Sequence, residues 1–165
     1  MKIGIVSDTH DRLENTAAAL RLLGAAGAEI VLHCGDIESP DTVRLFAGWP
    51  AHFVLGNCDW NPQGLRYAVA EIAATLHEPF GELDLAGAKI AWAHGHEKRV
   101  FEGLEQADKY DYLFYGHTHV AEQHRTGRTL VVNPGALHRV AEKTCVLLDL
   151  PTGELTTIRV PVAKE

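Results

Sequence analysis

The stretch KIGIVSDTH, residues 2–10, decides the fold, because an apolar run leads directly into a polar triplet. Residues 2–7 have the composition of a buried strand, and residues 12–26 carry apolar side chains at helical spacing. Asp8, Thr9 and His10 therefore lie at the turn between a strand and a helix. We predict an α/β fold that begins with this unit.

The same order of elements recurs up to residue 55. Gly27 ends the first helix, and Ser39-Pro40 is typical of a helix start with proline in the first turn. The predicted elements are a strand at residues 29–33, a helix at 41–47 and a strand at 51–55. This alternation implies a parallel sheet with right-handed crossovers.

The second half of the chain is dominated by strands. Ala86-Gly87 and the later segments 133–135 and 151–153 contain residues that favour tight turns. We predict helices at 65–76 and 100–107, a hairpin of strands 83–85 and 89–93, and further strands at 112–115, 129–132, 144–150 and 155–160.

Size and composition predict one domain over residues 1–165, since a chain with 46% hydrophobic content can bury a packed core. The apolar runs have only strand length and no basic leader precedes a long one, so we expect a soluble, cytoplasmic protein without a membrane segment. Cys34, Cys58 and Cys145 form no Cys-x-x-Cys pair. Neither a disulfide framework nor a thiolate zinc site is indicated.

The formal net charge of −7 argues against a surface that neutralises long stretches of nucleic-acid backbone. It does not argue against a small phosphorylated substrate, because bound metal cations supply positive potential that the formal charge omits. The chain also has 10 histidines, which prompts a search for metal-ligand spacing.

Polar clusters follow the apolar runs at five places. The carboxyl ends of parallel strands line one crevice, so residues far apart in the sequence can converge there. The clusters are Asp8-Thr9-His10, Gly35-Asp36, Gly56-Asn57-Cys58-Asp59, His94-Gly95-His96 and Gly116-His117-Thr118-His119.

The side chains in these clusters suit a metal site. Neutral imidazoles, carboxylates and an amide oxygen are ligands for Mn²⁺, Fe²⁺, Zn²⁺ and related ions. Glycines beside them let the backbone bend sharply and leave room for a phosphate. Each cluster alone is also typical of a surface turn, and His94 and His96 also suit ordinary strand ends. Their joint occurrence in order, each after a strand, favours the metal site.

These motifs resemble those of the calcineurin-like metallophosphoesterase superfamily: Asp-x-His, Gly-Asp, Gly-Asn-His/Cys-Asp, His-Gly and Gly-His-x-His. The resemblance spans residues 1–139, and the short length with Gly-Asn-Cys-Asp is similar to the small phosphodiesterases of the YfcE type. It implies a four-layer αββα sandwich of two packed mixed β-sheets flanked by helices.

The resemblance also implies two divalent metal ions per chain, with manganese expected and iron, zinc and nickel as alternatives. It assigns one ion to Asp8, His10, Asp36 and His119, and the other to Asp36, Asn57, His94 and His117. Asp36 would bridge the two. Two such ions about 3.5–4 Å apart can polarise a bridging hydroxide for in-line attack on a phosphate ester.

One departure from the superfamily concerns Cys58, where many members have a histidine that assists the leaving group. The substrate would then have a leaving group that departs easily, or the proton would come from water, from His96 or from His33. Cys58 itself is expected to be structural, because a neutral thiol is a weak donor, and Asp59 to orient the turn. The candidate catalytic residues are Asp36, Asn57, Cys58, Asp59 and His96.

Other residues are weaker candidates. The segment Asn-Pro-Gly-Ala at 133–136, where relatives commonly end in serine, is interpreted as a turn near the metals. Arg12, Arg66 and Arg139 could contact a phosphate, although surface helices and loops commonly carry arginine. Trp60 could form an aromatic wall for a base or aryl group.

Three functions are compatible with this pattern. A metal-dependent phosphodiesterase acting on a small phosphorylated substrate accounts for the complete ligand set. A non-catalytic scaffold is the alternative, because the phosphoesterase-like subunit of retromer resembles the same subgroup. A nuclease would need a basic track, which is not evident. Assembly into a homo-oligomer stays open.

Overall fold

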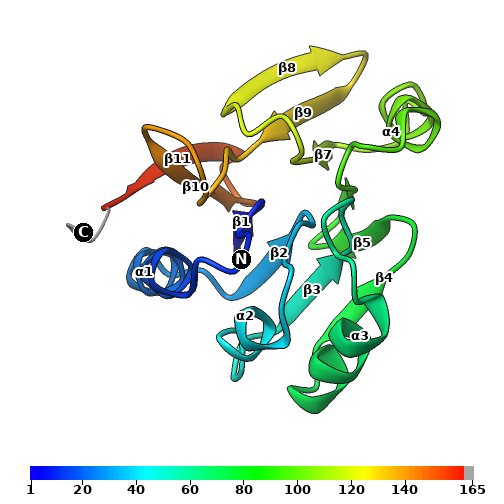
Figure 1. Cartoon of the computed structure of the whole chain (residues 1–165). Helices are drawn as coiled ribbons and strands as arrows, with labels where there is room; N and C mark the ends of the chain where they lie inside the picture. Colours follow the sequence, from blue (N-terminus) through cyan, green and yellow to red (C-terminus); the bar gives the residue numbers. More distant parts are fainter. Residues whose placement is uncertain (162–165) are drawn as a thin grey trace.

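The computed structural model describes residues 1–161, which form two β-sheets packed face to face between helices (Figure 1). Helices α1 (Leu13–Ala25), α2 (Pro40–Arg44) and α3 (Pro62–Glu71) cover the first sheet, and α4 (Lys98–Glu105) covers the second. This arrangement confirms the predicted four-layer α/β sandwich. Residues 162–165 of the predicted single domain lie outside the described part.

The first sheet is the one that the opening stretch predicts. Its strand order is β11-β10-β1-β2-β3-β4, and β1 to β4 run parallel. The C-terminal strands β10 and β11 add to β1 in antiparallel fashion. The bounds are β1 Lys2–Val6, β2 Ile30–His33, β3 Ala51–Val54, β4 Thr75–His77, β10 Lys143–Asp149 and β11 Glu154–Val160.

The second sheet has the order β5-β6-β7-β9-β8. Strands β5 and β6 form the predicted hairpin, and both Ala86 (φ 51°) and Gly87 (φ 83°) adopt the positive φ angles that favour a tight two-residue turn. The bounds are β5 Gly81–Leu85, β6 Ala88–Trp92, β7 Tyr112–Phe114, β8 Glu122–Thr126 and β9 Thr129–Asn133.

Successive side chains of β1 point to opposite faces of the sheet and so into two different layers of the core. Ile3 and Ile5 point between the sheets, where they pack with Trp92 of β6. Val6 points to the helices, and a Cβ at Gly4 would lie 2.9 Å from the Leu23 side chain of α1. One strand therefore anchors both the sheet–sheet and the helix–sheet interface.

The sequence prediction misplaced one helix and missed two strands, β4 and β8. The predicted helix at 65–76 begins earlier, at Pro62, because Asn61 caps it by accepting from the Gly64 N–H at 3.0 Å. It ends at Glu71, and Ala73 turns the chain with a φ of 56° into β4, which pairs with β3. The sequence pattern also missed β8, whose residues EQHRT are polar because this strand is an exposed sheet edge.

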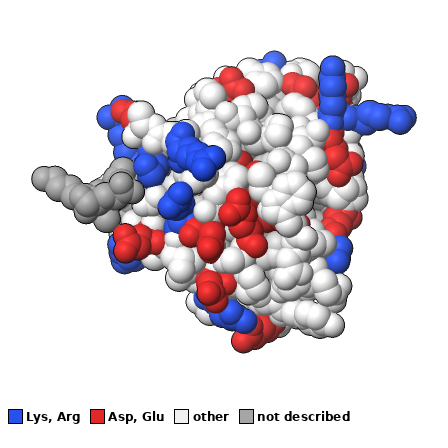
Figure 2. All heavy atoms as spheres, viewed as in Figure 1, with Lys and Arg blue, Asp and Glu red and all other residues white. Residues whose placement is uncertain are grey.

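The surface carries intermixed charges. On the face drawn in Figure 2, acidic and basic side chains lie near one another in groups, with broad uncharged areas between these groups. Arg44 pairs with Asp41 and Glu71, and Arg66 pairs with Glu78 through two nitrogens. None of the helices in residues 1–161 has the length and hydropathy that crossing a membrane requires.

Candidate metal centre

The candidate ligands follow strands of both sheets. Asp8 and His10 follow β1, Asp36 follows β2, and Asn57 follows β3. His94 follows β6 in the second sheet, and His117 and His119 follow β7. Because these strands are parallel within each sheet, their carboxyl ends open at the same edge of the sandwich.

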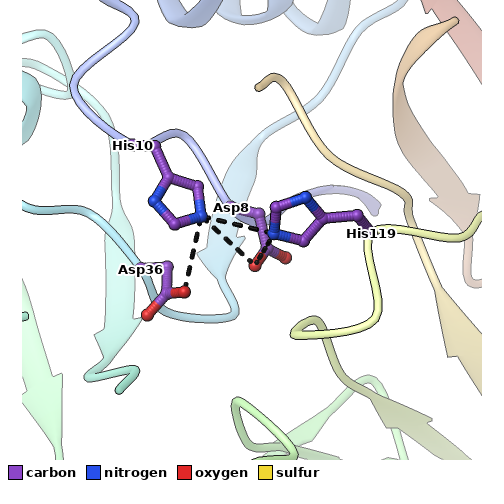
Figure 3. Close-up of side chains that lie close together, drawn as sticks. All are labelled: Asp8, His10, Asp36 and His119. Atoms are coloured by element: carbon purple, nitrogen blue, oxygen red, sulfur yellow. Dashed lines mark hydrogen bonds and ion pairs between the residues drawn. The ribbon is translucent and has the colours of Figure 1, made fainter. Parts of the chain in front are cut away.

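Four of the candidate ligands converge tightly, as Figure 3 shows: Asp8, His10, Asp36 and His119. Nε2 of His119 lies 3.2 Å from Oδ1 of Asp8, and Nε2 of His10 lies 3.4 Å from Oδ2 of Asp36. The two Nε2 atoms are 3.3 Å apart, and the four ligand atoms all lie within 4.8 Å of one another. This spacing allows all four to bind one ion.

A second group shares Asp36. Nε2 of His94 lies 3.3 Å from the same Oδ2 of Asp36 and 3.0 Å from Oδ1 of Asn57. The exposed ring of His117 lies 5.2 Å from that of His94 between centroids. One carboxylate oxygen of Asp36 thus lies between the imidazoles of His10 and His94.

Asp8 provides a test of whether a cation fits. Its Oδ2 accepts from the Ser7 hydroxyl at 2.5 Å and from the His117 N–H at 3.1 Å. Its Oδ1 is buried and has no hydrogen-bond partner within residues 1–161. A buried carboxylate oxygen without a partner is costly, and a cation bound between it and His119 would remove that cost. The donor set therefore fits a divalent metal ion.

Comparison with known proteins agrees with this geometry. The calcineurin-like phosphoesterase superfamily domain matches residues 1–153. The chain belongs to this superfamily. It is therefore a phosphoesterase, a hydrolase whose family uses divalent metal ions.

Individual relatives support the predicted subgroup. Phosphodiesterase MJ0936 of Methanocaldococcus jannaschii is 33% identical over 138 residues, 82% of this chain and 83% of that protein. Phosphodiesterase YfcE of Escherichia coli K12 is 27% identical over 154 residues, 83% of this chain and 79% of that protein. The predicted resemblance to YfcE-type members of the superfamily is confirmed.

Solved structures show the same fold. The structure of an archaeal phosphodiesterase superposes with a TM-score of 0.87 at 30% identity, covering 96% of this chain and 99% of its own. Zinc-bound Vps29 of Entamoeba histolytica has a TM-score of 0.66 at 19% identity, covering 97% of this chain and 98% of its own. The latter similarity concerns the fold.

In this phosphoesterase, hydrogen bonds keep Asp36 ionised. Burial alone would raise the pKa of Asp36, but the contact with His94 and the Cys58 N–H, which donates to Oδ1 at 2.8 Å, hold it below its usual range. A carboxylate that stays ionised at neutral pH keeps both oxygens available as acceptors.

The backbone at the metallophosphoesterase motifs is strained. Left-handed φ angles occur at Asp8 (52°), His10 (43°), Asp36 (57°), His117 (67°) and His119 (61°). Each such residue costs about 1–3 kcal/mol and persists only where its surroundings impose it, often at functional sites. Aspartate and histidine tolerate this region better than bulkier residues.

Glycines next to the ligands are required by close packing. A Cβ at Gly56 would lie 2.1 Å from Oδ1 of Asp36, and one at Gly116 would lie 2.5 Å from Oδ2 of Asp8. At Gly35 it would lie 2.8 Å from Nδ1 of His94. A side chain at any of these three positions would clash with a candidate ligand.

Asp59 links the two loops that carry Asp36 and Asn57. Its side chain is buried and accepts from the N–H groups of Asp36 (3.1 Å), Ile37 (2.8 Å), Glu38 (2.7 Å) and Gly56 (2.7 Å). These four bonds join the two loops that carry the candidate ligands Asp36 and Asn57.

The candidates for proton donation lie in different surroundings. His33 is fully buried, and its Nδ1 accepts from the Gly35 N–H at 3.1 Å while its Nε2 faces Thr9 Oγ1 at 3.1 Å. It cannot reach a substrate. His96 is 30% exposed and its ring lies 5.3 Å from that of His94.

Cys58 contributes its backbone more than its thiol. Besides the bond from its N–H to Asp36, its Sγ lies 3.3 Å from Nδ2 of Asn57. Burial, followed by the nearby Asp36, raises the pKa of the thiol to about 11, so it is protonated at neutral pH.

Sequence patterns missed two residues at the site. Oε1 of Glu38 accepts from Nδ1 of His10 at 2.7 Å, which directs Nε2 of His10 toward Asp36. His138 lies against His10 and accepts at Nδ1 from Nε of Arg12. Burial, then the charges of His10 and Arg12, lower the pKa of His138 to about 4. The sequence analysis pointed toward this region through the turn at residues 133–136 and through Arg12 and Arg139 as possible phosphate contacts, but not through His138 itself.

Proposed function

We propose that this metallophosphoesterase is a phosphodiesterase that binds two divalent metal ions. The observation that carries the proposal is the position of Asp36, whose Oδ2 lies between His10 at 3.4 Å and His94 at 3.3 Å. A single carboxylate between two imidazole groups suits a bridging ligand. Asp8, His10, Asp36 and His119 would hold one ion, and Asp36, Asn57, His94 and His117 the other.

The bound ions would supply an activated water and positive charge for the phosphoryl oxygens during in-line displacement. The protein's own residues place the ligands. Glu38 orients His10, the carbonyl of Cys34 orients His94 through Nδ1 at 2.8 Å, and Asp59 joins the loops of the first sheet. His96 is exposed beside the second group and stays the candidate proton donor.

Diester preference is part of the proposal. It is supported by MJ0936 and YfcE, both named phosphodiesterases. The test is hydrolysis of an aryl diester and the matching monoester by protein loaded with Mn²⁺, Ni²⁺, Mg²⁺ or Zn²⁺, with metal content measured in parallel. We expect a higher kcat/KM for the diester, and a clear monoester preference would overturn this part.

A non-catalytic scaffold is the second candidate, because Vps29 shares the fold. Trp60, which is 84% exposed next to the loop of Asn57 and Asp59, provides a surface for a partner. A scaffold would bind metal and hydrolyse none of the esters tested. Manganese as the metal, a cytoplasmic location, one domain over 1–165 and a homo-oligomer stay predictions.

A further inference from the structure

His138 is held against the first ligand group by its own loop. Its ring centroid lies 4.8 Å from that of His10, with the rings tilted by 42°. The N–H of Leu137 donates to the carbonyl of Asp8 at 3.2 Å, and the side-chain amide of Asn15 donates to the carbonyl of Leu137 at 2.9 Å. The imidazole is therefore positioned beside the metal ligands without being one of them.

Arg12 determines which nitrogen of His138 carries the proton. Its Nε donates to Nδ1 of His138 at 2.9 Å. A guanidinium is a donor only, so Nδ1 has to be the acceptor and, in the neutral ring, Nε2 carries the hydrogen. Arg12 is the hydrogen-bond partner that residues 1–161 provide for this ring. Within that part of the chain, the Nε2–H group has no hydrogen-bond acceptor.

We propose that Nε2–H of His138 donates a hydrogen bond to the phosphoryl group of the substrate and that Arg12 positions it for this role. The inference rests on the proposed function. An ion held by Asp8, His10, Asp36 and His119 would draw a phosphoryl oxygen to the side of the site where His138 lies. The guanidinium of Arg12 adds positive charge there, and phosphate oxygens are strong acceptors for such donors.

The proposed role of His138 compensates for the weak hydrogen-bond donor that Cys58 provides. A protonated thiol is a weak donor, whereas an imidazole N–H is a strong one. His138 comes from the loop after β9 and packs against the His10 ring, whereas Cys58 comes from the loop after β3 and contacts Asp36 through its backbone. The chain thereby gains a donor that the Gly-Asn-Cys-Asp motif lacks.

The experiment compares wild type with His138→Ala, His138→Gln and Arg12→Ala, each loaded with Mn²⁺ and checked for metal content. Binding of inorganic phosphate is measured by calorimetry, and kcat/KM with bis(p-nitrophenyl) phosphate. We expect His138→Ala to weaken phosphate binding and lower kcat/KM by about 10- to 100-fold, the usual range for a hydrogen bond to a charged group, with both metals retained. His138→Gln should recover part of the loss, since its amide N–H replaces Nε2–H.

Arg12→Ala should give a smaller loss than His138→Ala, because the ring is then free to adopt either tautomer. His124→Ala is the matched control: this exposed histidine of β8 binds Glu105, and its removal should change neither measurement. Wild-type phosphate affinity in His138→Ala would overturn the inference. So would a loss of metal that matches the loss of activity, because His138 would then support His10 rather than contact substrate.

The measurements distinguish a failure of the proposed function from a failure of the inference about His138. If metal-loaded wild type hydrolyses no ester but binds phosphate, the proposed function falls and the phosphate titrations still decide the role of His138. If wild type binds no phosphate, the inference about His138 falls whatever the outcome for hydrolysis.

Discussion

At the scale of single residues, Asp36 connects the two groups of candidate ligands. Asp36→Asn should abolish activity and weaken the binding of both metal ions. The reason is that the negative charge of Asp36 would otherwise offset the repulsion between two adjacent dications. His119→Ala should lower occupancy mainly at the ion that Asp8 and His10 share. Metal content by mass spectrometry after gel filtration measures both effects. Two bound metals and a near-normal rate in Asp36→Asn would contradict the bridging assignment.

The residue at position 58 should determine how strongly the rate depends on the leaving group. Without an imidazole at this position, the rate should depend steeply on leaving-group pKa, and Cys58→His should make that dependence shallower. A well-placed imidazole is typically worth about 10² to 10⁴ in rate, and alkyl esters should gain most. Cys58→Ala should change the rate little, because the thiol is protonated and its backbone N–H remains.

A series of aryl and alkyl diesters provides the linear free-energy plot for wild type and both Cys58 variants. A flat plot for wild type would show that another residue already protonates the leaving group. An inactive Cys58→Ala that keeps its metals would show a direct role for the thiol.

At the scale of elements, Asp59 joins the loops after β2 and β3 through four backbone N–H groups. Asp59→Ala leaves these donors without their acceptor, and each buried donor left unpaired costs about 1–3 kcal/mol. We expect the free energy of unfolding to fall by at least about 2 kcal/mol, with weaker binding at both metals. Urea denaturation of the metal-free protein measures the change in the free energy of unfolding separately from the change in metal binding.

Asp41→Ala serves as the control for this measurement, because Asp41 is an exposed partner of Arg44 and its ion pair contributes little. Equal stability of the Asp59 and Asp41 variants would refute the linking role of Asp59.

At the scale of the whole molecule, a histidine pair lies where the two sheets meet. Nδ1 of His52 on β3 lies 3.0 Å from Nε2 of His77 on β4, and the ring of His77 lies 4.8 Å from Trp92 of the second sheet. Burial lowers the pKa of both histidines, with a further contribution to His52 from His77. Both rings therefore bind a proton less readily in the folded protein than in the unfolded chain.

The sign of the resulting pH dependence follows from proton binding. Below the ordinary histidine pKa the unfolded chain binds more protons than the folded pair does, so stability falls as the pH drops below about 6.5. Urea unfolding between pH 7 and 5 should show a shallower pH dependence in the double variant His52→Gln/His77→Gln than in wild type. Identical slopes would show that the pair does not contribute.

The sequence by itself determined the parallel β1–β3 core and the order of the clusters, because apolar period and turn residues are local properties of the chain. It also predicted the ligand types, since each cluster follows a strand whose end is visible in the pattern. The sequence pattern did not predict β4 or β8, because a short or polar segment becomes a strand only by pairing with a neighbour.

Only the tertiary structure decided which groups surround the ligands. Glu38 on His10, Asp59 across two loops and His138 with Arg12 are contacts between residues that no periodicity relates. His33 was a plausible proton donor in sequence, yet folding buries it completely. The physical reason is that strand and turn formation depend on neighbouring residues, whereas burial and hydrogen-bond partners depend on how the two sheets bring separate loops together.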